Sequence, residues 1–168
     1  MLRPRGLRTY SAGGWATAPE ESAFFAYGVY DGVWSKLAKL ANLKVINHNS
    51  VAKYRGAHNT EEIGRALDVA YVLTGNVQRQ GASIRLNAEL IDVRKNAPVW
   101  GEQYDRNLSD LFTLQGEIAQ KIADKLGVGV SPAEKTAFQD VPTSDLISYD
   151  AYLRAKDLLY DIALSTRL

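Results

Sequence analysis

The sequence predicts an α/β (α+β) layered domain, in which a mixed β-sheet with an antiparallel meander is flanked by helices. The first observation is a run at residues 84–90, where even-numbered residues are apolar and odd-numbered residues are polar. The second is a pair of segments, 24–41 and 111–126, whose apolar residues recur every three or four positions. A two-residue period is typical of a half-buried strand, and a 3.6-residue period of an amphipathic helix.

The composition is that of an ordinary globular protein. The 168 residues include 20 Lys and Arg against 19 Asp and Glu, which leaves a formal net charge of +1. A charge so close to zero argues against nucleic acid or an anionic membrane as a partner for the whole surface. The chain has no cysteine, which excludes disulfides, thiolate zinc sites and cysteine nucleophiles.

Residues 1–20 are predicted to be an atypical tail. The basic start, Met1–Arg8, is followed by small and polar residues broken by Gly and Pro, where a signal peptide would need an apolar stretch. No window approaches the roughly 18 apolar residues of a membrane span. We expect a chain without a signal peptide or membrane span that is cytoplasmic as expressed. The compartment of the parent protein stays open, with the cell envelope or periplasm as alternatives.

The first helix is predicted from Glu20 to Asn42, and a short buried strand from Leu43 to Asn47. Asn59 and Glu62 then have the spacing of a helix N-cap and its third residue, which predicts a helix through Leu67. The apolar stripe of the first helix consists of Phe24, Phe25, Val29, Val33, Trp34, Leu37, Leu40 and Ala41.

Three strands follow as an antiparallel meander with one solvated face. The first is predicted at Val69–Gln80, and a turn at Gly81-Ala82 leads into the alternating strand at 84–90. A second turn at Arg94–Pro98 precedes the third strand, Val99–Arg106. The apolar face of the middle strand (Ile84, Leu86, Ala88 and Leu90) is expected to be covered by the helix at 111–126.

The remaining elements are helical. Ser109 is predicted to cap the helix at 111–126, and Gly127 and Gly129 to end it. Ser131 and Glu134 form a capping-box pattern with Pro at the first helical position, which predicts a short helix to about Phe138. A linker at 140–144 then precedes a last helix at about 146–164. We therefore divide the chain into a tail (1–20), an α/β domain (21–130) and a C-terminal linker and helix (131–168).

The sequence contains no recognisable catalytic, cofactor or metal motif. Its two histidines, His48 and His58, are interpreted as solvated loop residues. The triplet Tyr104-Asp105-Arg106 either recognises a ligand or ties the strand to the next helix, and we favour the second interpretation. Tyrosines at helical spacing in the last helix are more typical of a packing face. The candidate interaction surface is made of Trp100, Tyr104, Asp105, Arg106, Tyr149, Tyr152 and Tyr160.

Nine stretches of the sequence match, in order, the pattern of one known family. They are Phe25–Val29, Leu37–Ile46, Asn49–Tyr54, Glu62–Leu73, Gly75–Arg79, Ile84–Asp92, Val99–Arg106, Leu111–Ala119 and Asp150–Lys156. On these residues the chain resembles the TolB-like N-terminal domain of bacterial tetratricopeptide-repeat and adenylate-cyclase-associated proteins. The resemblance implies a mixed sheet flanked by helices, with the last helix leading into a repeat region that is truncated here.

The sequence departs from the family pattern at two places. Tyr27 stands where the family has Asp, and residues 1–20 lack the family's opening strand. Loss of that strand would expose a sheet edge, so the isolated chain is expected to self-associate through it or to be only marginally stable.

Three functions are open at this point. The favoured one is a non-enzymatic accessory module whose partners are other proteins and the repeat region, without a cofactor. The first alternative is a part of an adenylate-cyclase-type signalling enzyme. The second is a sensor of small ligands that uses Trp100, Tyr104 and Arg106 between the sheet and the helices.

Overall fold

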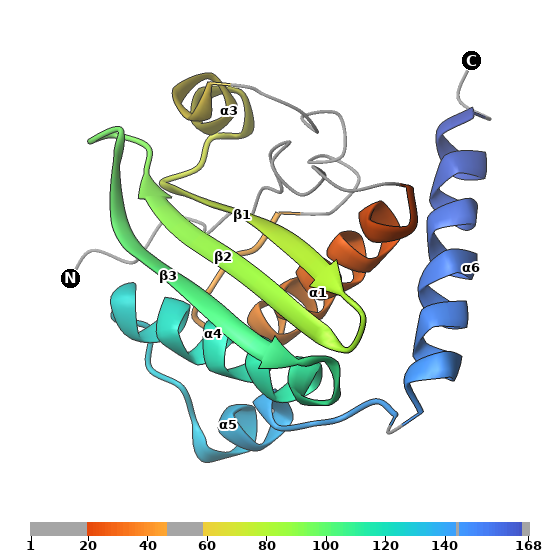
Figure 1. Cartoon of the computed structure of the whole chain (residues 1–168). Helices are drawn as coiled ribbons and strands as arrows, with labels where there is room; N and C mark the ends of the chain where they lie inside the picture. Colours follow the sequence, from red (N-terminus) through yellow and green to blue (C-terminus); the bar gives the residue numbers. More distant parts are fainter. Residues whose placement is uncertain (1–19, 47–58, 144, 166–168) are drawn as a thin grey trace.

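The computed structural model describes residues 20–46, 59–143 and 145–165, and the predictions for residues 1–19 lie outside this part of the chain. Helices and one three-stranded sheet form the described part (Figure 1). In chain order the elements are α1 (Glu20–Ala38), α3 (Thr60–Leu67), β1 (Tyr71–Gln80), β2 (Ser83–Asp92), β3 (Ala97–Asn107), a 3₁₀ turn (Leu108–Asp110), α4 (Leu111–Lys125), α5 (Pro132–Phe138) and α6 (Leu146–Ser165).

The sheet has the order β1-β2-β3, and both pairings are antiparallel. Two tight turns join the strands. Gly81 (φ +60°) and Asn96 (φ +47°) adopt the left-handed conformation that these turns require, which glycine and asparagine tolerate best. The predicted meander is confirmed. The predicted α/β (α+β) class is confirmed as well, and every strand pairing among the described residues is antiparallel.

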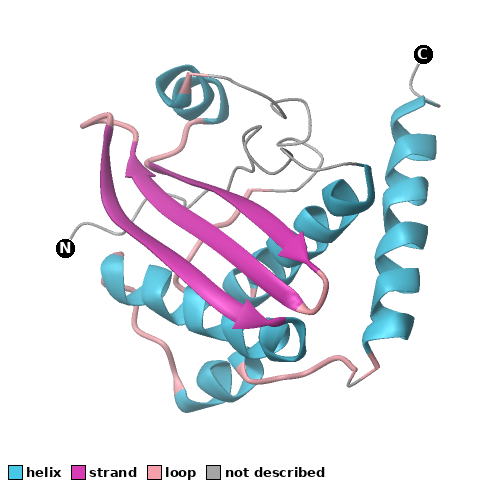
Figure 2. Cartoon of the chain, in the orientation of Figure 1, coloured by secondary structure: helices cyan, strands magenta, loops and turns pink. Residues whose placement is uncertain are grey.

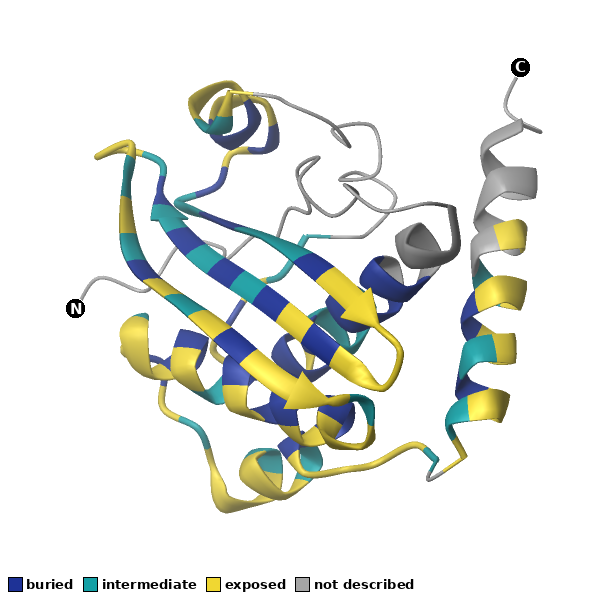
Figure 3. Ribbon diagram, viewed as in Figure 1, coloured by how far each residue is buried: buried dark blue, intermediate teal, exposed yellow. Residues whose placement is uncertain are grey.

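The helices α1 and α4 cover one face of the sheet, and α6 lies beside α1 (Figure 2). The alternating residues of β2 point into this helical layer, where they share one apolar core with the stripes of α1 and α4. Figure 3 shows the alternation as dark and light bands along β2. The prediction that the 111–126 helix covers the apolar face of β2 is therefore confirmed.

The other face of the sheet is polar along most of its length. It carries Asn76, Asn87, Gln103 and Asp105, and Asn87 Nδ2 donates a hydrogen bond of 2.7 Å to Asn76 Oδ1. At one end, α3 contributes Ile63 and Leu67 to a small separate apolar cluster with Val69 and Val72. The sheet therefore presents a largely hydrophilic surface on the side away from α1 and α4.

The short strand predicted at Leu43–Asn47 is wrong for its described residues, 43–46, which form no strand. Leu43 is buried in the main core as an irregular segment. The carbonyl of Ile46 accepts a hydrogen bond of 2.9 Å from Trp34 Nε1. The indole of Trp34 in α1 thus donates to a backbone carbonyl that, in a sheet, would accept from a neighbouring strand.

The helix boundaries agree with the predicted caps except at Ser109, and α1 ends at Ala38 instead of the predicted Asn42. Asn59 Oδ1 accepts from the Glu61 amide, and Ser131 with Glu134 completes a capping box, as predicted. Ser109, however, lies inside the 3₁₀ turn, and α4 starts after Asp110 without a side-chain cap. The Leu108 amide at the start of this turn donates a hydrogen bond of 2.7 Å to Ala82 O.

No helix in the described ranges combines the length and apolar character that a membrane crossing needs.

Candidate functional site

The seven residues of the predicted interaction surface lie in two separate regions. Trp100 and Tyr104 point from β3 into the helical layer, where both are buried in the main core. Asp105 and Arg106 lie at the exposed end of the same strand. Tyr149 and Tyr152 belong to α6, on the far side of α1 and α4, and the side chain of Tyr160 lies outside the described set.

Tyr104 belongs to a polar network between β3 and α4. Its hydroxyl donates a hydrogen bond of 2.5 Å to Glu102, whose other oxygen lies 3.3 Å from Lys121 Nζ. The hydrogen bond from Tyr104, helped by Lys121, lowers the pKa of Glu102. Burial, together with the carboxylate of Glu102, raises the pKa of Tyr104. The buried indole N–H of Trp100 has no hydrogen-bond partner of good geometry, although it lies near enough to Glu102 to favour the charged carboxylate.

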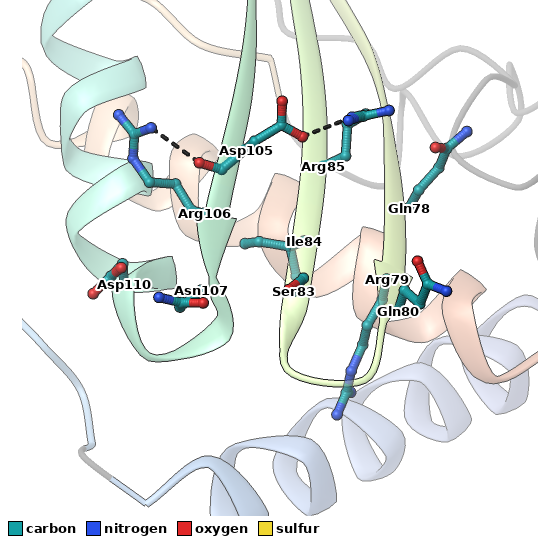
Figure 4. A pocket seen from close by; sticks show the side chains of 10 residues that line it. All are labelled: Gln78, Arg79, Gln80, Ser83, Ile84, Arg85, Asp105, Arg106, Asn107 and Asp110. Carbon is teal, nitrogen blue, oxygen red and sulfur yellow. Dashed lines mark hydrogen bonds and ion pairs between the residues drawn. The ribbon is translucent and has the colours of Figure 1, made fainter.

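At the hairpin end of the sheet, a hollow of about 760 Å³ opens between the strand ends (Figure 4). Its charged residues are Arg79, Arg85, Asp105, Arg106 and Asp110. Asp105 accepts a hydrogen bond of 2.6 Å from Arg85 Nε, and this bond is the main reason that the pKa of Asp105 is lowered.

The three arginines of this hollow point in different directions (Figure 4). Arg106 lies over the Tyr104 ring and 3.6 Å from Glu117 of α4, whereas Arg79 lies over Phe25 of α1. Each cation therefore joins a strand to a neighbouring element, and no common point is left where they could bind one anion together. Arg106 thus contacts the following helix as favoured, whereas the hydrogen bonds to Asp105 come from Arg85 and Gln103 within the sheet.

A second hollow, of about 710 Å³, lies between α1, α4, α6 and the segment 137–143, and we call it the helical cleft. Aromatic side chains form much of its wall. The Tyr149 ring meets Phe112 edge-on at 4.7 Å between centroids, and Tyr152 lies at 6.3 Å from Tyr149 in a more parallel orientation. Tyr149 Oη donates a long hydrogen bond of 3.4 Å to Gly28 O, and burial raises the pKa of Tyr149 to about 12.

Charged groups of α1 are bound by the C-terminal third of the chain. Lys36 is only 6% exposed, and its Nζ donates to the carbonyls of Phe138 at 2.6 Å and Asp140 at 3.1 Å. Burial, and secondarily the charge of Lys39, lowers the pKa of Lys36. Asp31 pairs with Lys156 of α6 at 2.6 Å. Burial acts against the charge of Lys156, but the bond to Asp31 outweighs it and raises the pKa.

The sequence predictions missed Lys36 and Gln115. Both are buried and polar, and both line the helical cleft. A signal was present, because Lys36 is three residues after Val33 and four before Leu40, both in the predicted stripe. Gln115 lies beside Leu114 and Leu111 in the same way. A polar residue inside an apolar stripe must find a buried partner, or line a cavity.

The described residues hold no group of three or more His, Asp or Glu side chains arranged to bind a metal ion. The two histidines, His48 and His58, lie outside the described ranges.

Comparison with known protein families shows one match over more than half of the chain. Residues 21–124, from the first full turn of α1 to the end of α4, match the second domain of HilA/YgeH-like transcriptional regulators. The chain belongs to this family. The HilA/YgeH-like match covers the sheet, its two covering helices and α3, and it ends before the helical cleft is completed by α5 and α6.

A bacterial relative is similar to this chain over most of its length. The chain is 33% identical over 140 residues to a protein of Rhizobium meliloti (strain 1021) named "Putative adenylate cyclase 3". The match covers 83% of this chain and 24% of that protein, so this HilA/YgeH-like chain spans about a quarter of its relative.

Two solved structures share the fold. TolB from Acinetobacter baumannii superimposes with a TM-score of 0.53 and 15% identity, over 71% of this chain and 27% of TolB. Lipoprotein GNA1162 from Neisseria meningitidis superimposes with a TM-score of 0.51 and 15% identity, over 72% of this chain and 99% of the lipoprotein. The resemblance to TolB-like domains is thus confirmed for the fold, while the repeat region and the link to adenylate cyclases stay predictions.

Proposed function

We propose that the chain is a non-enzymatic protein-interaction module of a bacterial regulatory protein. Its membership of the HilA/YgeH-like family supports the regulatory setting. The distribution of exposed apolar side chains supports the interaction role. Among the described residues, the large hydrophobic side chains that are exposed all fall between positions 141 and 158: Val141, Ile147, Tyr152 and Leu158.

The observation that carries the proposal is that α6 has apolar residues on two opposite faces. Tyr149 and Leu153 are buried against the body of the domain, and the side of α6 that faces away from the domain is exposed (Figure 3). Ile147 is 83% exposed and Leu158 63% exposed. The two are eleven residues apart, about three helical turns, so they lie on one stripe of the helix. A helix that is apolar on opposite faces is typical of one packed between two partners.

The occupant that we propose for this outer stripe is a helix of the region that adjoins the domain in its parent protein. The relative in Rhizobium meliloti is about four times as long as the matched part, so such domains occur beside much additional chain. A helix–helix contact buries an apolar stripe of the kind that α6 presents. The tetratricopeptide repeats expected from the TolB-like resemblance would supply helices of this type.

Site-specific photo-crosslinking in cells tests this proposal. A benzophenone amino acid is placed at Ile147 or at Leu158, with Ala133 on the exposed side of α5 as the matched control. We expect discrete adducts from the two α6 positions and none from position 133, and mass spectrometry of the adduct identifies the adjoining helical region. Adducts of equal yield at all three positions, or adducts only with a second copy of the chain, would contradict the assignment.

The alternative of a signalling cyclase is tested separately. The purified chain is incubated with ATP and Mg²⁺ or Mn²⁺, and cyclic AMP is measured by mass spectrometry. We expect no product above a no-protein control. Turnover that follows the protein through two chromatographic steps would replace the proposed role with an enzymatic one.

A further inference from the structure

The helical cleft has the size and lining of a small-molecule site. Its volume of about 710 Å³ falls inside the range of roughly 300–1,000 Å³ that is typical of ligand pockets. Four parts of the chain line it: α1, α4, the segment 137–143 and α6. Ligand sites are mostly apolar with a few placed polar groups, and the cleft combines three aromatic rings with a small set of such groups.

The floor of the cleft holds two donors, Gln115 and Tyr149, which share one backbone acceptor at long distances and also contact each other. Gln115 is 2% exposed, and its Nε2 donates a hydrogen bond of 3.5 Å to Gly28 O, which also accepts the 3.4 Å bond from Tyr149 Oη. Both distances are at the upper limit for a hydrogen bond, so a ligand acceptor could form shorter bonds with these donors. Gly32 makes this arrangement possible, because a Cβ at that position would overlap the Gln115 amide.

The mouth of the cleft favours a negative group. Four charged residues line the cleft: Asp31, Lys36, Lys39 and Asp140. Asp31 is neutralised by its ion pair with Lys156. Lys36 and Lys39 therefore leave one positive charge in excess over Asp140. Lys39 is exposed and forms no ion pair with any described residue, so its ammonium is available to a ligand.

From this lining we propose that the helical cleft binds a small planar aromatic anion. The rings of Phe112, Tyr149 and Tyr152 contact the aromatic part, Gln115 and Tyr149 donate to a ligand oxygen, and Lys39 pairs with the anionic group. Because the ligand contacts both the α1–α4 layer and α6, its binding fixes α6 against the domain. This inference uses the inner side of α6 and is independent of the outer stripe assigned to a protein partner.

Fluorescence titration of the intact chain with 8-anilinonaphthalene-1-sulfonate, an aromatic anion with a planar naphthalene ring, tests the site. We expect saturable binding that salicylate displaces and that benzylamine, an aromatic cation of similar size, does not. Lys39→Glu should weaken binding by about tenfold, because it reverses the charge at the mouth. Lys135→Glu, an equal charge change on exposed α5 outside the cleft, should leave the affinity unchanged.

Two further variants distinguish dye binding in the helical cleft from dye binding to other apolar surfaces. Gln115→Leu removes a floor donor at nearly constant volume and should weaken salicylate competition, with circular dichroism confirming that the variant is folded. Ile147→Ser removes the most exposed of the large apolar side chains described on α6 and should leave binding intact. Equal affinity for the Lys39 and Lys135 variants would overturn the assignment, as would loss of fluorescence in Ile147→Ser alone. Failure of these tests leaves the crosslinking result for the outer stripe unaffected.

Discussion

Gly116 shows how closely the helices pack at the scale of a single residue. It lies on α4 where the end of α5 crosses, and a Cβ at this position would overlap the carbonyl oxygen of Phe138. The obstacle is backbone, so it cannot rotate away as a flexible side chain could. The same carbonyl accepts the hydrogen bond from Lys36, which limits how far it can move.

We predict that Gly116→Ala destabilises the protein by about 1–3 kcal/mol, the usual cost of overpacking. Urea unfolding followed by circular dichroism measures the change in the free energy of unfolding. Gly101→Ala is the control, because a Cβ on that exposed strand position meets only ordinary contacts of 3.7 Å or more. Equal effects of the two substitutions would show that α4 and α5 can separate at little cost.

At the scale of elements, the capping box of α5 shows how local hydrogen bonds set the start of a helix. The Ser131 hydroxyl oxygen accepts a hydrogen bond from the Glu134 amide, and the Glu134 carboxylate accepts one from the Ser131 amide. The second oxygen of Glu134 accepts from the amide of Ala41, just after α1. These bonds are the main reason that the pKa of Glu134 is lowered, so acid should loosen the start of α5 as that carboxylate takes up a proton.

Ser131→Ala is predicted to cost about 1 kcal/mol, in line with the loss of other serine N-caps. Ser109→Ala should change the free energy of unfolding by less than about 0.5 kcal/mol, because Ser109 does not cap α4. Thermal melts of the two variants, analysed with the same heat capacity change, give the comparison. A larger loss for Ser109→Ala would mean that its hydroxyl stabilises the 3₁₀ turn more than the structure indicates.

Much of the fold could be predicted because it follows from local pattern. The alternation at 84–90 and the capping residues Asn59 and Ser131 each act over a few residues. The strand predicted at 43–47 failed because a strand depends on a partner, and an apolar run looks the same whether it pairs or packs as coil. The helical cleft could not be predicted, since its walls come from positions 31 to 152 and only the tertiary fold brings them together.

At the scale of the whole molecule, the raised pKa values of buried tyrosines make the free energy of unfolding fall at alkaline pH. An unfolded tyrosine loses its proton near pH 10, whereas the pKa of Tyr149 in the folded protein is about 12. Between these values the native state keeps a proton that the unfolded state releases. Stability is therefore complete below about pH 10 and is lost as the pH rises towards 12.

Tyr149→Phe should make this alkaline loss of stability smaller. Urea unfolding of the wild type and of Tyr149→Phe is measured at pH 8, 10 and 11. The difference between their free energies of unfolding should narrow as the pH rises. Tyr104, whose pKa is also raised, keeps part of the dependence in the variant. If both proteins lose stability in parallel over this range, the phenol of Tyr149 is not the group responsible.

The contacts of Lys36 and Ala41 have a consequence for where the domain can be cut. Their acceptors, Phe138 O, Asp140 O and the Glu134 carboxylate, lie 93 to 104 residues further along the chain. An expression fragment that stops at residue 130 would lack both carbonyls that accept from the Lys36 ammonium and the carboxylate that accepts from the Ala41 amide. During synthesis on the ribosome, Lys36 and Ala41 likewise cannot form these hydrogen bonds until α5 and the residues after it have emerged from the exit tunnel.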